Sequence, residues 1–115
     1  MKLIDKKNIK PMEWGNHCES WQLLDKENMG VFHEKMPPNS ADVLHKHQFS
    51  EQFLYVLHGT VGIVINTDTH YLSSGQGIVI TKEVPHKIFN DSKSDVEFIL
   101  FASPSHRNDR IEIEQ

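Results

Sequence analysis

The sequence predicts an all-β sandwich or barrel, and three observations support this fold class. Short apolar or alternating segments recur along the chain and are separated by turn residues about every 8–12 residues. These segments are rich in β-branched and aromatic side chains, which favour strands. None of them shows the helical periodicity of an amphipathic helix. At 115 residues, the chain suits a single domain with one core.

About ten short strands are predicted, each ending where turn-forming residues begin. In chain order they cover residues 21–24, 30–36, 43–47, 53–57, 61–65, 71–72, 78–80, 86–89, 96–102 and 111–114. The separating turns contain Asn, Asp, Ser and Gly, and the turn after 30–36 contains Pro37 and Pro38, which cannot donate to a β-ladder. The last strand is a strict alternation of Ile and Glu, typical of a strand with one exposed face.

The strand from Phe53 to Leu57 is apolar at both parities. Successive side chains of a strand point to opposite faces, so we expect both faces of this strand to be covered. One face would line the interior, and the other would contact a second sheet or a second subunit. We therefore expect a homodimer, with Phe53, Tyr55 and Leu57 facing outward.

Composition excludes several classes of protein. The formal net charge is −4 and no cluster of basic residues is present, which argues against nucleic acid as a partner. The longest apolar runs are far shorter than the roughly 20 residues of a membrane span. The single cysteine permits no internal disulfide, and the N-terminus lacks the apolar segment of a signal peptide. We expect a cytoplasmic protein.

The sequence contains 8 histidines, and two of them form a His-x-His pair. His45 and His47 lie two residues apart, so on a strand both imidazoles point to the same side. Neighbouring histidines are awkward core residues, because each ring nitrogen needs a partner. Neutral imidazoles are, however, good ligands of divalent metal ions.

The residues around this pair resemble the two motifs of the cupin family. In the first motif, at about 39–59, Asn39 stands at the opening glycine, followed by His45, His47 and the closing Gly59. In the second, at about 75–90, Gly75, His86 and Asn90 match, whereas Thr81 and Glu83 stand at the family's Pro and Gly positions. The resemblance implies one cupin domain over residues 1–115, folded as a jelly-roll (double-stranded β-helix) barrel.

The resemblance also implies a metal site formed by His45, His47, His86 and one residue of the first motif. Counting back from Gly59 favours Gln52 as this residue, and Glu51 is the alternative. With Gln52, Leu54 and Val56 would point inward. Four neutral ligands leave the full charge on one divalent transition metal ion (Zn, Ni, Fe, Mn or Co), which favours Lewis-acid chemistry.

We therefore expect an isomerase, lyase or cyclase that acts on a small oxygenated metabolite, such as a sugar acid or keto compound. The alternatives are a cupin dioxygenase and a non-catalytic module that binds a metal or a small molecule. His58, His33 and Glu51 are the candidate proton-transfer residues. Similar ligand sets occur in cupins that linearise unsaturated uronates and in zinc cupins that cyclise polyketides. The acidic and arginine positions of the uronate enzymes correspond here to Leu100 and His106.

Two arginines, Arg107 and Arg110, lie near the end of the chain. An arginine can hold a substrate carboxylate through two parallel hydrogen bonds. The acidic residues Asp109 and Glu112 lie beside them in the sequence, and we expect the arginines to pair with these.

Overall fold

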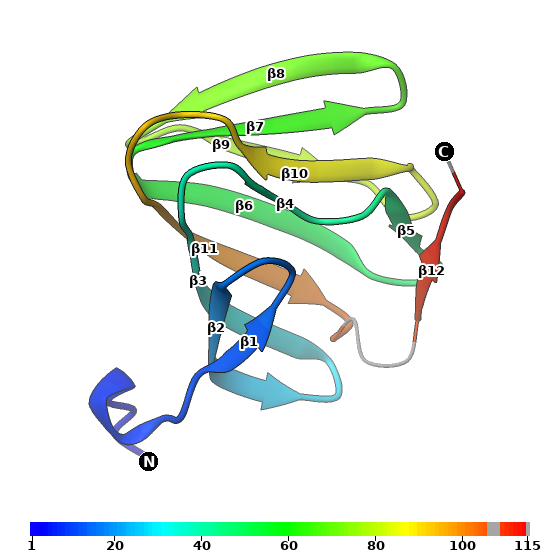
Figure 1. Cartoon of the computed structure of the whole chain (residues 1–115). Helices are drawn as coiled ribbons and strands as arrows, with labels where there is room; N and C mark the ends of the chain where they lie inside the picture. Colours follow the sequence, from blue (N-terminus) through cyan, green and yellow to red (C-terminus); the bar gives the residue numbers. More distant parts are fainter. Residues whose placement is uncertain (106–108, 115) are drawn as a thin grey trace.

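The fold is a pair of antiparallel β-sheets that face each other (Figure 1). A computed structural model describes residues 1–105 and 109–114. Sheet A has the strand order β1-β2-β3-β11-β6-β9. Its strands are β1 (Met12–Trp14), β2 (Cys18–Lys26), β3 (Met29–Met36), β11 (Val96–Ser103), β6 (Glu51–His58) and β9 (Gly77–Ile80).

Sheet B has the order β12-β5-β10-β7-β8, and a short strand, β4, also pairs with β10. Its strands are β12 (Arg110–Glu112), β5 (His45–His47), β10 (His86–Asn90), β7 (Thr60–Ile65), β8 (Asp68–Ser73) and β4 (Ser40–Ala41). The predicted all-β jelly-roll is confirmed. Each predicted strand has a counterpart, while β1 and β4 were not predicted because both are too short to show a pattern.

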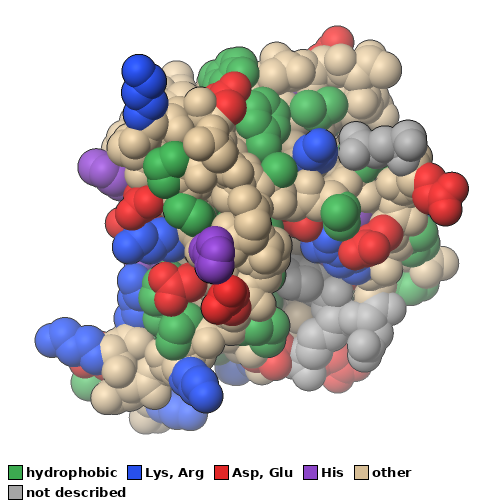
Figure 2. Space-filling model, viewed as in Figure 1, with side chains coloured by type: hydrophobic (Ala, Val, Ile, Leu, Met, Phe, Trp, Pro, Cys, Tyr) green, Lys and Arg blue, Asp and Glu red, His purple; other side chains and the backbone are tan. Residues whose placement is uncertain are grey.

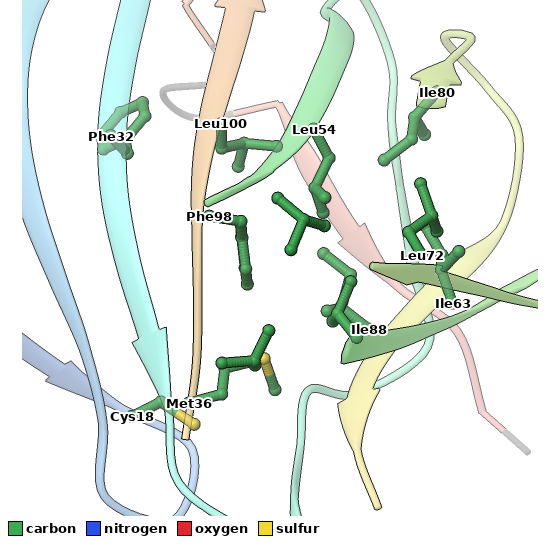
Figure 3. Close-up of a cluster of buried hydrophobic side chains, with 13 residues drawn as sticks. Cys18, Phe32, Met36, Leu54, Ile63, Leu72, Ile80, Ile88, Phe98 and Leu100 are labelled. Carbon is green, nitrogen blue, oxygen red and sulfur yellow. The ribbon is translucent and has the colours of Figure 1, made fainter. Parts of the chain in front are cut away.

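The hydrophobic core lies between the two sheets. Figure 3 shows Leu54 and Phe98 of sheet A directed toward Ile63 and Ile88 of sheet B. The inward residues of β6 are buried and its outward residues are exposed, as the alternation of a strand requires. The other large core side chains are Phe32, Met36, Val56, Val61, Leu72, Ile80, Val96 and Leu100.

The chain before β1 contains a single turn of 3-10 helix, η1 (Lys6–Asn8). Asp5 caps it by accepting a hydrogen bond from the amide of Lys7, at 2.9 Å. In the part of the chain that the structure describes, no helix is long and apolar enough to cross a membrane. Acidic, basic and hydrophobic side chains are interspersed on the face shown in Figure 2.

Candidate metal centre

Three histidines converge on the inner side of sheet B. His45 and His47 lie at the two ends of β5, and both are buried. His86, the first residue of β10, is paired with His45 in the antiparallel ladder. One potential ligand atom from each ring lies within 4.8 Å of the others. The His-x-His spacing thus places two imidazoles on one face, and strand pairing adds the third.

Two of the rings are oriented by the backbone two residues before them. Nδ1 of His45 donates to the carbonyl of Val43 at 2.8 Å, and Nδ1 of His86 donates to the carbonyl of Val84 at 3.0 Å. This arrangement puts the proton on Nδ1 and leaves Nε2 with its lone pair. Nε2 of His86 is buried and has no hydrogen-bond partner among the described residues. A buried polar atom without a partner is costly, so a ligand such as a metal ion fits here.

A carboxylate orients the third ring. Nδ1 of His47 lies 2.8 Å from Oδ1 of Asp109, while Oδ2 of Asp109 accepts from the amides of Phe49 and Ser50 at 3.1 and 2.9 Å. Burial acts to raise the pKa of Asp109, but these hydrogen bonds outweigh it and lower the pKa. A carboxylate behind a histidine is the usual support of a metal-binding imidazole.

The electrostatics of the centre favour neutral imidazoles. Burial lowers the pKa of His45 to about 4, and the neighbouring His86 and Arg110 also contribute. Burial, together with the proximity of His47, also lowers the pKa of His86. Neutral imidazole is the form that binds a metal ion. The three histidines therefore fit a divalent transition metal in geometry, and the lowered pKa values of His45 and His86 favour the metal-binding form of these two rings.

The two alternatives for the fourth position lie on opposite faces of β6. The side chain of Gln52 is buried and lines the same cavity as His45 and His47. Glu51 lies at the opposite parity of β6 and is exposed. Gln52, which points inward like Leu54, is the residue that the motif spacing to Gly59 favours.

The three expected proton-transfer residues lie elsewhere. Glu51 and His58 are exposed, and neither is part of the cavity lining. Although His58 shares the parity of Gln52, six residues of extended strand separate them by about 20 Å. His33 was expected near the cavity, but strand alternation places it on the outer face of sheet A. There Nε2 of His33 is 2.9 Å from Oε1 of Glu97.

A cavity of about 520 Å³ extends from the histidines between the two sheets. Among the residues that sequence reasoning missed are Glu34 and Asp42, which line the cavity, and Asp109, which lies behind His47. Glu34 shares its parity on β3 with the buried Phe32 and Met36, and this alternation could have identified it as inward. Nothing local could have identified Asp109, because its contact with His47 depends on the pairing of β12 with β5.

Arg110 also contributes to the cavity wall. Its two terminal nitrogens donate to Asp42 at 3.2 and 2.8 Å, and Glu112 lies farther away, at 3.6 Å. The main acidic partner is thus Asp42, a residue distant in sequence, in place of the expected Asp109. Arg107 and His106 lie outside the described residues. Leu100 is buried and presents an apolar side chain to the cavity.

Comparison with known proteins agrees with this architecture. The family model described as "Cupin domain" matches residues 32–102. The polyketide cyclase RemF from Streptomyces resistomycificus superimposes with a TM-score of 0.84 at 19% identity, covering 100% of this chain and 87% of RemF. A predicted oxalate decarboxylase from Thermotoga maritima gives 0.82 at 23% identity, covering 90% of this chain and 100% of the other. At these identities the likeness shows the fold.

Among curated proteins, Protein SchB from Streptomyces halstedii is 32% identical over 60 residues. The match covers 52% of this chain and 44% of SchB. Across the curated relatives that match, the chain covers between 44% and 62% of their length. The chain therefore corresponds to part of each of these relatives.

Proposed function

The chain belongs to the cupin family, and from this premise we propose that it binds one divalent transition metal ion and uses it as a Lewis acid on a small oxygenated metabolite. The observation that carries the proposal is the inward convergence of His45, His47 and His86. Two of the rings are held by backbone carbonyls and the third by Asp109.

We propose Gln52 as the fourth ligand, through its amide oxygen. A bound ion would polarise a carbonyl or hydroxyl oxygen of the substrate. The chain's own residues orient the imidazoles, and the cavity beside them provides space for the substrate. Because all four proposed ligands are neutral, the site favours electron-rich oxygen ligands over neutral apolar ones.

Isomerase, lyase or cyclase chemistry is the proposed reaction class. The likeness to the polyketide cyclase RemF and to the predicted oxalate decarboxylase supports chemistry on oxygenated carbon compounds. A turnover that requires molecular oxygen would instead favour the dioxygenase alternative, and anaerobic assays separate the two.

The experiment that tests the centre is elemental analysis of the natively purified protein. We expect about one equivalent of a divalent transition metal in the wild type and its loss in His86→Ala. His70→Ala, a change at an exposed histidine of β8, is the matched control and should retain the metal. Equal metal content in all three proteins would refute the centre.

We also propose a homodimer formed through the outer face of sheet A. Phe53, Tyr55 and Phe101 each remain about 40% exposed there. The ring of Phe53 lies 6.4 Å from that of Tyr55 and 6.1 Å from that of Phe101. Leu57 and Val79 extend the same apolar surface on β6 and β9. A second copy of this chain offers the same aromatic surface, so the two apolar surfaces would bury each other.

A further inference from the structure

The metal-binding histidines lie on one wall of the cavity, and a buried carboxyl group lies on the other. Glu34 projects inward from β3 of sheet A, is 9% exposed, and lines the same cavity as His45 and His47. Asp42, which lies 3.7 Å from Nδ1 of His45, is close enough to act electrostatically on Glu34. Glu34 is thus part of the same chamber without being a member of the histidine cluster.

The surroundings of Glu34 are polar only in part. Nε1 of Trp14 donates to Oε2 of Glu34 at 2.9 Å, and the side chain of Ser20 also hydrogen-bonds it. Within residues 1–105 and 109–114, no lysine or arginine forms a salt bridge with Glu34. Burial raises the pKa of Glu34 to about 7, and the negative charge of Asp42 adds to the effect. Near neutral pH, therefore, a large fraction of Glu34 carries a proton.

Among the described residues, none of the other charged groups near Glu34 forms a salt bridge with it. Arg110 is engaged by Asp42 through two hydrogen bonds. Lys10 lines the cavity from the segment before β1, and Cys18 is a buried thiol whose pKa is raised by its own burial. A neutral carboxyl in such a place acts as a hydrogen-bond donor.

Apolar side chains form most of the wall beyond the metal-binding end. They are Ile9, Met12, Trp14, Phe32, Ile88, Phe98 and Leu100, and the polar residues Ser20 and Gln22 also line this part of the cavity. A ligand that carries hydroxyl groups on every side, such as a sugar, would place many of these hydroxyl groups against apolar side chains, where they would have no hydrogen-bond partner. A flat, apolar ring would bury its faces here, and the volume of about 520 Å³ suits a molecule of two or more rings.

On the premise of the metal centre above, we propose that Glu34 is a second anchor for the substrate. It donates a hydrogen bond to a carbonyl oxygen of a largely apolar ring compound, while an oxygen at the other end of that compound faces the histidines. The substrate class is thereby narrowed to keto-substituted ring compounds, in preference to sugar acids.

The test compares 2-acetylnaphthalene with 2-isopropenylnaphthalene, which has nearly the same shape but no oxygen. Binding to the zinc-loaded protein is measured by fluorescence at pH 6 and pH 8.5. We expect the ketone to bind roughly two- to tenfold more tightly at pH 6, the usual contribution of one hydrogen bond. This advantage should disappear at pH 8.5, because Glu34 has then lost its proton.

Two variants separate hydrogen bonding from a merely structural role. In Glu34→Gln, the amide oxygen can still accept from Trp14 and the amide N–H can still donate, so the ketone advantage should persist at both pH values. In Glu34→Leu, the advantage should be absent at both. A role limited to holding Trp14 in place would give no pH-dependent difference between the two compounds.

Metal-stripped protein distinguishes the two proposals. If Glu34 is the anchor, the ketone keeps its advantage after zinc is removed. If the tighter binding of the ketone depends on zinc and persists in Glu34→Leu, the proposed role of Glu34 is wrong. Failure of both naphthalenes to bind would also contradict it. Failure of the metal proposal is detected independently, by the zinc content of the protein.

Discussion

Replacing Glu34 with glutamine should stabilise the protein, and more strongly as the pH rises. The folded-state pKa of Glu34 is about 7, against the ordinary value of 4.5. Between these two values the unfolded chain has lost the proton while the folded chain still holds it. The folded state therefore loses stability as the pH rises through this window.

The size of the effect follows from the two pKa values. Each pKa unit corresponds to about 1.4 kcal/mol, so ionising Glu34 in the fold costs about 3 kcal/mol once the pH is above 7. At pH 5.5 only about 1.5 kcal/mol of this cost is present by the same linkage relation. Glutamine does not titrate and keeps an acceptor for Trp14. The stabilisation by Glu34→Gln should thus increase by about 2 kcal/mol between pH 5.5 and pH 8.

Urea denaturation of both proteins at the two pH values measures this difference by linear extrapolation. Because wild type and variant share the metal centre, its own pH dependence cancels in the comparison. Glu27→Gln, in the exposed turn between β2 and β3, controls for the general loss of one acidic side chain. If Glu34→Gln raises the free energy of unfolding equally at both pH values, or raises it less at the higher pH, then Glu34 is not a buried group that holds its proton near neutral pH.

Three further predictions concern the ligands and the outer surface. Asp109→Asn should weaken metal affinity about 10- to 100-fold, because it removes the negative charge behind His47. Metal affinity is measured by competition with a chelator. As a control, Glu112→Gln on β12 should leave the metal affinity unchanged. Gln52→Ala should reduce metal retention while Glu51→Ala retains it; elemental analysis giving the reverse would make Glu51 the ligand. Phe53→Lys should convert the proposed dimer to a monomer in light scattering, whereas Tyr71→Lys, on the exposed outer face of sheet B, should not; a monomeric wild type would contradict the dimer.

Much of the site was predictable because its determinants are local. The alternation of β6 placed Leu54 and Val56 inward, and the His-x-His spacing placed two imidazoles on one face. Asn39, at the family's opening glycine, has a φ of 60°, a conformation that asparagine tolerates. Glu83, at the second glycine position of the second motif, has a φ of 68°. The turn therefore keeps a left-handed backbone conformation that residues other than glycine rarely adopt.

What was not predictable depends on contacts between distant segments. His33 was expected near the cavity from the family resemblance, whereas its own strand places Glu34 there, beside Phe32. Asp109 reaches His47 across 62 residues of sequence, and Asp42 reaches Arg110 across 68. Such pairs depend on which strands lie side by side in the sheets. The spacing of residues within one sequence motif does not give this strand order.

The proposed ligands come from both sheets: three imidazoles from sheet B and the Gln52 amide from sheet A. An ion held by all four would cross-link the two layers near β5 and β12. Opening of the layers at that point would then require release of the ion, so the hydrogen-exchange rates of the β5 and β6 amides would report metal occupancy.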